Sequence, residues 1–303
     1  MRFPTPFPFL VTLQEIALSD FEKAESLAEN LETPFQPVND PSVPGVAEMV
    51  EVAFWSHLLS AASGLQLTTP DKVHEAFRGL KFSKAPGPNG IPNRALKHLP
   101  KRAVSLLACV FNAVLRSHHF PQAWKYARVT CILKPGKDPA LPSSYRPISL
   151  LDTIGKLFEK ILLATILYVG NERGLLWDEQ FGFRPGHSTS LQLTRLVERT
   201  ARNFGEKRLT GAVFLDVAKA FDTVWIDGLL YKQTLLNFPS YIVHTISSYL
   251  RGRTFEASFQ TDTSSRPCMR AGVPQGGLLS RTSSVCMSTT CLQHHTTSSW
   301  RSM

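Results

Sequence analysis

Apolar residues recur every three or four positions in several stretches of the chain, the spacing that places them on one face of an amphipathic helix. The clearest stretch is 102–117, where one stripe holds Val104, Leu107, Phe111, Val114 and Leu115. Similar spacing predicts helices over 155–169, over most of 46–80 and, with many acidic residues, over 15–32. Residues 33–45 contain four prolines, which predicts a linker between the helix at 15–32 and the helical region that starts at residue 46.

Other segments have the pattern of strands. Residues 126–138, "YARVTCILKPGKD", alternate apolar and polar side chains and then reach a Pro-Gly turn. Residues 213–217 carry an apolar run into Asp216, and a further strand is expected near 255–259. An Asp at the end of a strand often only caps the next turn, so Asp216 alone does not identify a site.

Length and composition narrow the class of protein. A chain of 303 residues with 43% hydrophobic residues is long enough for one large or two ordinary globular domains. Its longest apolar runs are too short for a membrane helix, and Pro4, Pro6 and Pro8 interrupt any signal-peptide helix. Five cysteines without a paired framework suit a reducing compartment. We therefore expect an intracellular protein, nuclear or cytoplasmic, without a membrane partner.

The charge is unevenly distributed. The net charge is +9, yet residues 1–80 carry −7, which leaves +16 on the remaining residues. A body this basic suits a polyanion such as nucleic acid, because cationic side chains release the counterions of its phosphates. The alternative is a basic surface that only keeps the protein soluble.

Several glycine- and proline-rich turns carry basic side chains. "KAPGPNGIP" at 84–92 is a rigid turn, and "ILKPGKD" places Lys134 and Lys137 on the turn after a strand. "SYRPISLL" offers Arg146, and "QFGFRPGHST" offers Arg184 followed by a Ser or Thr that caps a helix. Each turn alone is more often a solvated surface feature than a site.

Their order along the chain is more informative. Together "KAPGPNGI", "WKYARVTCILKPGKD", "SYRPISLLDTIGKLFEKIL", "QFGFRPGHST", "FLDVAKAFDTV" and "GVPQGGLLS" resemble the successive motifs of reverse transcriptases from non-LTR (LINE-type) retrotransposons, in particular the jockey-like group. The resemblance extends over roughly residues 15 to 280. Asn89 replaces the Asp more usual at its turn, and either residue tolerates that geometry.

The resemblance implies an α+β fold class, that of a right-hand polymerase with helical fingers at 81–205 and a partial palm at 206–280. Residues 1–80 would be an acidic helical arm with a proline-rich linker, and residues 281–303 a disordered, out-of-frame tail. The thumb and an upstream endonuclease are expected to be absent.

The resemblance also implies a metal site for two Mg²⁺ ions. Asp216 matches the first metal-binding aspartate of the palm, and the carbonyl of Val217 would add an oxygen ligand. Asp222 is a possible second ligand, but its place after Phe221 better suits an N-cap.

Four further residues match substrate-binding positions of the family. Phe221 matches the bulky residue that excludes a ribose 2′-OH, Lys134 and Arg146 match residues that hold the triphosphate, and Gln275 lines the nucleotide pocket. The alternatives are a core phenylalanine, a solvated lysine and an ordinary turn glutamine.

The segment after Ser280 departs from the family, whose members continue to a hairpin bearing Ala-Asp-Asp. Eleven of the residues 281–303 are Ser or Thr, and no Asp or Glu follows Asp262. A zinc knuckle would use Cys286, Cys291, His294 and His295, but their spacing fits no standard finger. A frameshift explains composition and missing motif together.

The implied function is that of an RNA-directed DNA polymerase, which transfers a nucleotidyl group from a dNTP to a primer 3′-OH on an RNA template. Without the Ala-Asp-Asp acids we expect this chain to be inactive. The alternative is a non-catalytic nucleic-acid-binding remnant or pseudogene product. A polymerase that copies RNA into RNA is disfavoured by Phe221.

Overall fold

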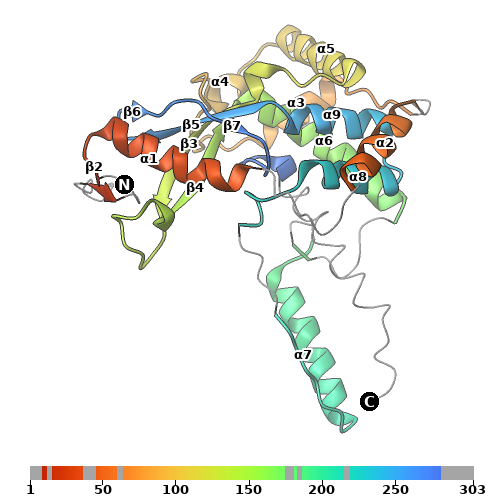
Figure 1. Cartoon of the computed structure of the whole chain (residues 1–303). Helices are drawn as coiled ribbons and strands as arrows, with labels where there is room; N and C mark the ends of the chain where they lie inside the picture. Colours follow the sequence, from red (N-terminus) through yellow and green to blue (C-terminus); the bar gives the residue numbers. More distant parts are fainter. Residues whose placement is uncertain are drawn as a thin grey trace.

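The computed structural model describes residues 9–11, 16–36, 46–59, 64–174, 181–182, 186–214 and 219–280. They form helices around a mainly antiparallel sheet, which is consistent with the expected α+β class (Figure 1). The tail after Ser280, with the four zinc candidates, lies outside the described residues.

The helices of the described residues vary in length from one to five turns. They are α1 (Asp20–Glu32), α2 (Val46–Leu59), α3 (Pro70–Arg78), α4 (Asn93–Lys97), α5 (Lys101–Ser117), α6 (Thr153–Glu172), α7 (Thr189–Gly205), α8 (Ile226–Leu235) and α9 (Ser240–Leu250). The predicted helices at 102–117 and 155–169 are confirmed by α5 and α6. No helix among the described residues is long and apolar enough to cross a membrane.

The main sheet has the order β4-β3-β5-β6, with β7 also paired to β5. Its strands are β3 (Tyr126–Leu133), β4 (Tyr145–Leu151), β5 (Arg253–Phe259), β6 (Asp262–Thr263) and β7 (Cys268–Met269). β3 is antiparallel to β4 and parallel to β5, so Ala127 has Leu151 on one side and Phe255 on the other. β1 (Leu10–Val11) and β2 (Ile16–Ala17) form a separate antiparallel pair. The predicted strands at 126–133 and 255–259 are confirmed.

Helix α1 covers one face of this sheet (Figure 1). It begins after Ser19, because the Ser19 hydroxyl accepts from the Glu22 amide while the Glu22 carboxylate accepts from the Ser19 amide. The predicted start at residue 15 is therefore wrong, since residues 16 and 17 form β2. Leu27, Ala28 and Leu31 pack against the apolar side chains of β3 and β5.

A second core lies between the helices. Phe111 of α5, Phe158 of α6 and Tyr249 of α9 are fully buried, and Phe120 contacts the rings of the last two. Their interplanar angles of 58° and 81° are the tilted and edge-to-face arrangements that aromatic rings prefer.

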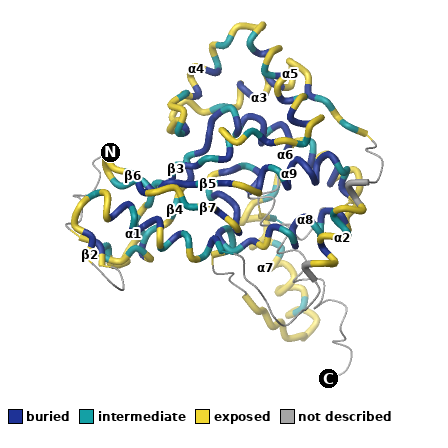
Figure 2. The backbone as a smooth tube through the Cα atoms, turned by 45° about the horizontal axis from the view of Figure 1, so that its top comes forward, coloured by how far each residue is buried: buried dark blue, intermediate teal, exposed yellow. Residues whose placement is uncertain are grey.

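The expected palm strand at 213–217 is not formed in its described part. Val213 and Phe214 are not in a strand, and they are 86% and 84% exposed. A strand needs a hydrogen-bonded neighbour, and none of the described strands pairs with this segment. Helix α7 is likewise almost wholly exposed in Figure 2 and has no buried residue.

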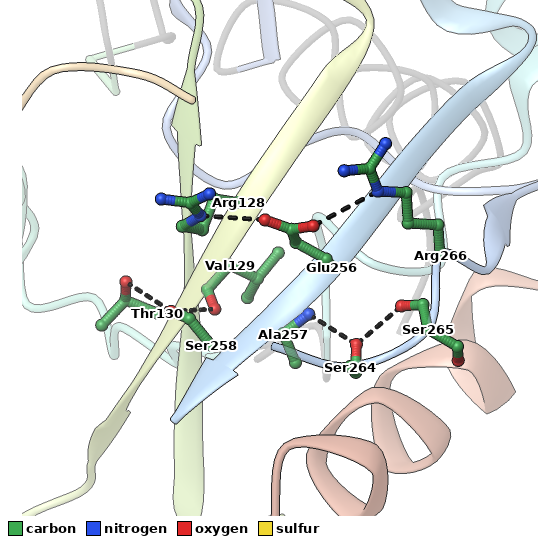
Figure 3. A network of polar contacts seen from close by, with 9 residues as sticks. All are labelled: Arg128, Val129, Thr130, Glu256, Ala257, Ser258, Ser264, Ser265 and Arg266. Atoms are coloured by element: carbon green, nitrogen blue, oxygen red, sulfur yellow. Dashed lines mark hydrogen bonds and ion pairs between the residues drawn. The ribbon is translucent and has the colours of Figure 1, made fainter. Parts of the chain in front are cut away.

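A buried acid connects β3 and β5 on the main sheet. The Glu256 carboxylate accepts from Arg128 Nε at 2.9 Å and from Arg266 Nε at 3.3 Å (Figure 3). Burial by itself raises the pKa of Glu256, but the Tyr126 hydroxyl and the guanidinium groups of Arg128 and Arg266 together outweigh burial, and the pKa is lowered. The parallel pair is thus fixed by side chains as well as by its backbone ladder.

Candidate active site

Four of the turn motifs meet at one junction of the fold. The Ser149 amide on β4 donates to the Gln275 carbonyl at 2.8 Å, and the Val273 amide donates to the Phe221 carbonyl at 2.7 Å. The loop 271–280 is therefore held against the edge of β4 on one side and the turn 219–224 on the other. Lys134 lies nearby, directly after β3.

Two glycines make this close approach feasible. Gly272 has φ +80° and Gly276 has φ +143°, conformations that L side chains rarely adopt. A Cβ at Gly272 would collide with the Asp222 carbonyl, and one at Gly276 would collide with the Ser149 carbonyl. These contacts give a structural reason for the glycines of "GVPQGG".

Asp222 faces the loop and does not cap a helix. Its carboxylate accepts from Gln275 Nε2 at 2.8 Å, and α8 begins only at Ile226, after Trp225. The predicted N-cap role is wrong, because the chain makes a further turn at 219–223 before the helix starts. Burial raises the pKa of Asp222, against the opposing effects of the Gln275 hydrogen bond, Lys219 and Lys134.

Two of the predicted substrate-binding side chains lie beside this junction, one on the turn after β3 and one on β4. Lys134 Nζ donates to the Ser143 carbonyl at 2.8 Å, which holds it on the turn between β3 and β4. Arg146 is exposed on β4, opposite Ile132 of β3. Its guanidinium thus lies at the surface, three residues from the Ser149 contact.

Phe221 and Gln275 are partly buried. Phe221 packs against the helical core, as the alternative of a core phenylalanine expects, and the amide of Gln275 is directed to Asp222. Their roles in nucleotide selection stay predictions.

Asp216, Val217 and Arg184 lie outside the described residues. Among the residues that are described, no three His, Cys, Asp or Glu side chains converge to hold a metal ion. Asp222 is committed to Gln275 inside the protein. The described donors therefore do not fit a magnesium site, and no chemical step through Mg²⁺ follows from them.

Sequence reasoning missed Glu159 of α6, which is 1% exposed and lies under the loop. Its Oε2 accepts from the Leu278 amide at 2.6 Å and from the Leu279 amide at 3.3 Å. Burial raises the pKa of Glu159, with Arg253 and these amides opposing it. The available signal was an acid on the buried stripe of a predicted helix, because such a position usually has a buried partner.

Asn89 also has a partner that the sequence does not reveal. Its side-chain amide donates to the Asp152 carboxylate, and its Oδ1 accepts from the Ile91 amide. The other oxygen of Asp152 accepts from the Ile154 and Gly155 amides and caps α6. The turn 84–92 is thereby joined to the start of α6.

Comparison with known proteins agrees with this arrangement of motifs. The family model described as reverse transcriptase (RNA-dependent DNA polymerase) matches residues 132–298, which extends past Ser280 into the last segment. The assignment of that segment to an out-of-frame tail stays a prediction.

Curated relatives from Drosophila melanogaster are similar over most of this chain. It is 38% identical over 271 residues to the probable RNA-directed DNA polymerase from transposon BS, with 88% of this chain and 29% of that protein aligned. It is also 38% identical over 267 residues to the RNA-directed DNA polymerase from mobile element jockey, with 87% and 28% aligned. The chain spans less than a third of the length of these relatives. It belongs to the reverse transcriptase family, within the group of non-LTR retrotransposon polymerases similar to jockey.

Proposed function

We propose that this chain is the fingers and partial palm of an RNA-directed DNA polymerase that copies RNA into DNA from a primer 3′-OH. The partners would be an RNA template, a DNA primer and dNTPs. Support comes from the family and from the convergence of its motifs at the junction of β3, β4, the turn 219–224 and the loop 271–280. That convergence is the observation that carries the proposal.

The side chains at the junction suit a nucleotide. Lys134 and Arg146 supply positive charge at the surface of the junction, where an ammonium and a guanidinium group would attract and hydrogen-bond a triphosphate. The Phe221 ring would stand beside the sugar, where it has no room for a 2′-OH. Gln275, braced by Asp222, would line the base side of the same space.

Catalysis needs more carboxylate oxygens than this chain offers. Asp216 is the predicted metal ligand, and no Asp or Glu follows Asp262 in the sequence. One carboxylate leaves the charge of two divalent cations largely uncompensated. We therefore expect the 303-residue chain to be inactive by itself.

Primer extension on an RNA template, with dNTPs and Mg²⁺, tests both the polymerase assignment and the proposed inactivity of the 303-residue chain. The chain alone should not extend the primer, whereas a longer chain that carries an Ala-Asp-Asp hairpin should, and Asp216→Ala should abolish that activity. Extension by the 303-residue chain that Asp216→Ala removes would overturn the proposed inactivity. An inactive, folded longer chain would overturn the polymerase assignment of this site.

A second candidate is nucleic-acid binding without catalysis. The burial of Asp222 against Gln275 favours it, because this acid is withheld from a metal. In that case the chain binds an RNA–DNA hybrid with little sequence preference, and binding weakens steeply with salt. Titration of a labelled hybrid at two salt concentrations checks this, and an unchanged affinity would contradict it.

A further inference from the structure

A long part of the sequence contains no acid. From Ala76 to Lys137 there are twelve Lys and Arg residues and no Asp or Glu. An ordinary solvated surface mixes both signs of charge, so this composition leaves an excess of positive charge in this part of the chain. Most of this stretch lies in α3, α4, α5 and the turns between them.

Six of these cations lie on α3, on α4, at the start of α5 and on the turn after α3. His74 and Arg78 of α3 and Lys97 of α4 line a cavity of about 220 Å³. The Asn93 side chain donates to the Lys81 carbonyl at 2.7 Å and holds the turn after α3 against α4. The short Pro100 connection then places Lys101 at the start of α5. We call Arg78, Lys81, Arg94, Lys97, Lys101 and Arg102 the basic face.

The residues that the structure describes offer the basic face no ion-pair partner. None of the described carboxylates forms an ion pair with any of its six cations. Asp71 and Glu75 are the acids of α3, and both are exposed. The cations are therefore available to an external anion.

An exposed aromatic ring lies within this face. Phe82 is 60% exposed, and Lys97 Nζ lies 4.4 Å from its ring centroid. A large apolar ring gains nothing from water, whereas a nucleobase stacks on such a ring while its phosphate meets the neighbouring cation. A ring between cations suits a chain that alternates flat bases with phosphates.

We propose that the basic face is a binding surface for single-stranded nucleic acid, with phosphates on Arg94, Lys97 and Lys101 and a base stacked on Phe82. It shares no residue with the nucleotide junction, and it rests on the proposed function only in the class of its partner. Its positive helices α4 and α5 lie at the top of Figures 1 and 2, whereas α7 lies at the bottom. Helix α7 therefore serves as a control for substitutions far from the basic face.

Matched double variants test the electrostatic part. Lys97→Ala/Lys101→Ala and Arg199→Ala/Arg202→Ala each remove two positive charges, the first pair from the basic face and the second from α7. Affinity for a labelled single-stranded RNA is measured against salt, with circular dichroism to verify folding. The first pair should weaken binding about tenfold or more at low salt and reduce the salt slope by about 1.4, the value for two phosphate contacts. The double substitution in α7 should change the RNA affinity and the salt slope much less.

Phe82 tests the stacking part. Phe82→Leu keeps an apolar side chain without a flat ring and should weaken RNA binding about tenfold, whereas Phe82→Tyr should retain it. Neither change should alter binding of inorganic polyphosphate, which has no bases.

Each outcome distinguishes the two proposals. Equal losses from both double variants, or an equal effect of Phe82→Leu on polyphosphate, would overturn the basic face and leave the polymerase site untouched. Tighter binding to anionic lipid vesicles than to RNA, lost in the same double variant, would also overturn it. An active longer polymerase would uphold the proposed function in either event.

Discussion

Asn89 donates its side-chain amide to the Asp152 carboxylate that caps α6. An Asp at position 89 would place two carboxylates in contact and lose the donor. We expect Asn89→Asp to lower the free energy of unfolding by about 1 to 2 kcal/mol at pH 7, because a satisfied acceptor becomes a repulsive pair. Urea unfolding measures the difference.

The exchanged pair is the control for that prediction. Asn89→Asp/Asp152→Asn restores one amide and one carboxylate, and Asn remains a good helix cap. Most of the lost stability should therefore return. If the double variant is as unstable as the sum of the single ones, the contact does not link the turn to α6.

Glu159 should make stability depend on pH in an unusual direction. Because burial raises its pKa above the ordinary 4.5, the folded protein holds this proton more tightly than the unfolded chain does. Stability should then fall as pH rises from about 4.5 through the raised value, by up to about 1.4 kcal/mol per pH unit. Glu159→Gln, which still offers an oxygen to Leu278 and Leu279, should lack this slope.

Denaturant unfolding between pH 4 and 8 checks the slope. The exposed Glu75→Gln serves as the matched control and should leave the wild-type slope in place. Identical slopes for wild type and Glu159→Gln would contradict the role of burial.

Single contacts were the least predictable features of the site. Gly272 and Gly276 have positive φ and lie against the carbonyls of Asp222 and Ser149. The partners of Asp222 and Asn89 come from segments 53 and 63 residues away. No local pattern encodes such pairs, so the N-cap assignment of Asp222 followed the local rule and was wrong.

At the scale of elements, periodicity was informative wherever an element buries one face. α5 and α6 match their predicted stripes, and β3 matches its alternation. The segment at 213–214 has the same apolar character as a strand but lacks a paired neighbour among the described residues. Residue propensity favours a strand, but the strand forms only where a neighbouring strand can pair with it.

The parallel pair β3 and β5 should depend on Glu256. Since its folded pKa is lowered, its stabilisation is present above the ordinary value of 4.5 and is lost as pH falls through the folded value. Glu256→Gln should cost about 1 to 3 kcal/mol at pH 7, because a neutral amide cannot accept from both guanidinium groups. The difference from wild type should shrink as pH is lowered below 4.5, as unfolding curves measured at a series of pH values would show. A constant difference would mean that shape, and not charge, links the strands.

At the scale of the whole molecule, α1 is part of the body. Leu27 is 1% exposed between α1 and the sheet, and Leu27→Ala should lower the free energy of unfolding by about 2 to 5 kcal/mol. Leu106→Ala is the control, because Leu106 is 66% exposed on α5 and should change little. Thermal or urea unfolding of both variants compares them. If both substitutions changed the free energy of unfolding by the same small amount, α1 would be a detachable arm, in agreement with the predicted arm at residues 1–80.

The pairing of β3 with β5 also means that the sheet cannot be completed until late in synthesis of the chain. The Arg128 and Glu256 side chains that meet across these strands are 128 residues apart in sequence. The sequence separation between α1 and β5 is larger still. At about 5 to 20 residues per second, the apolar side of α1 would leave the ribosome roughly 10 to 45 s before β5 does. During that interval Leu27, Ala28 and Leu31 lack their contacts with β5, so we expect the nascent chain to be prone to aggregation until β5 has emerged.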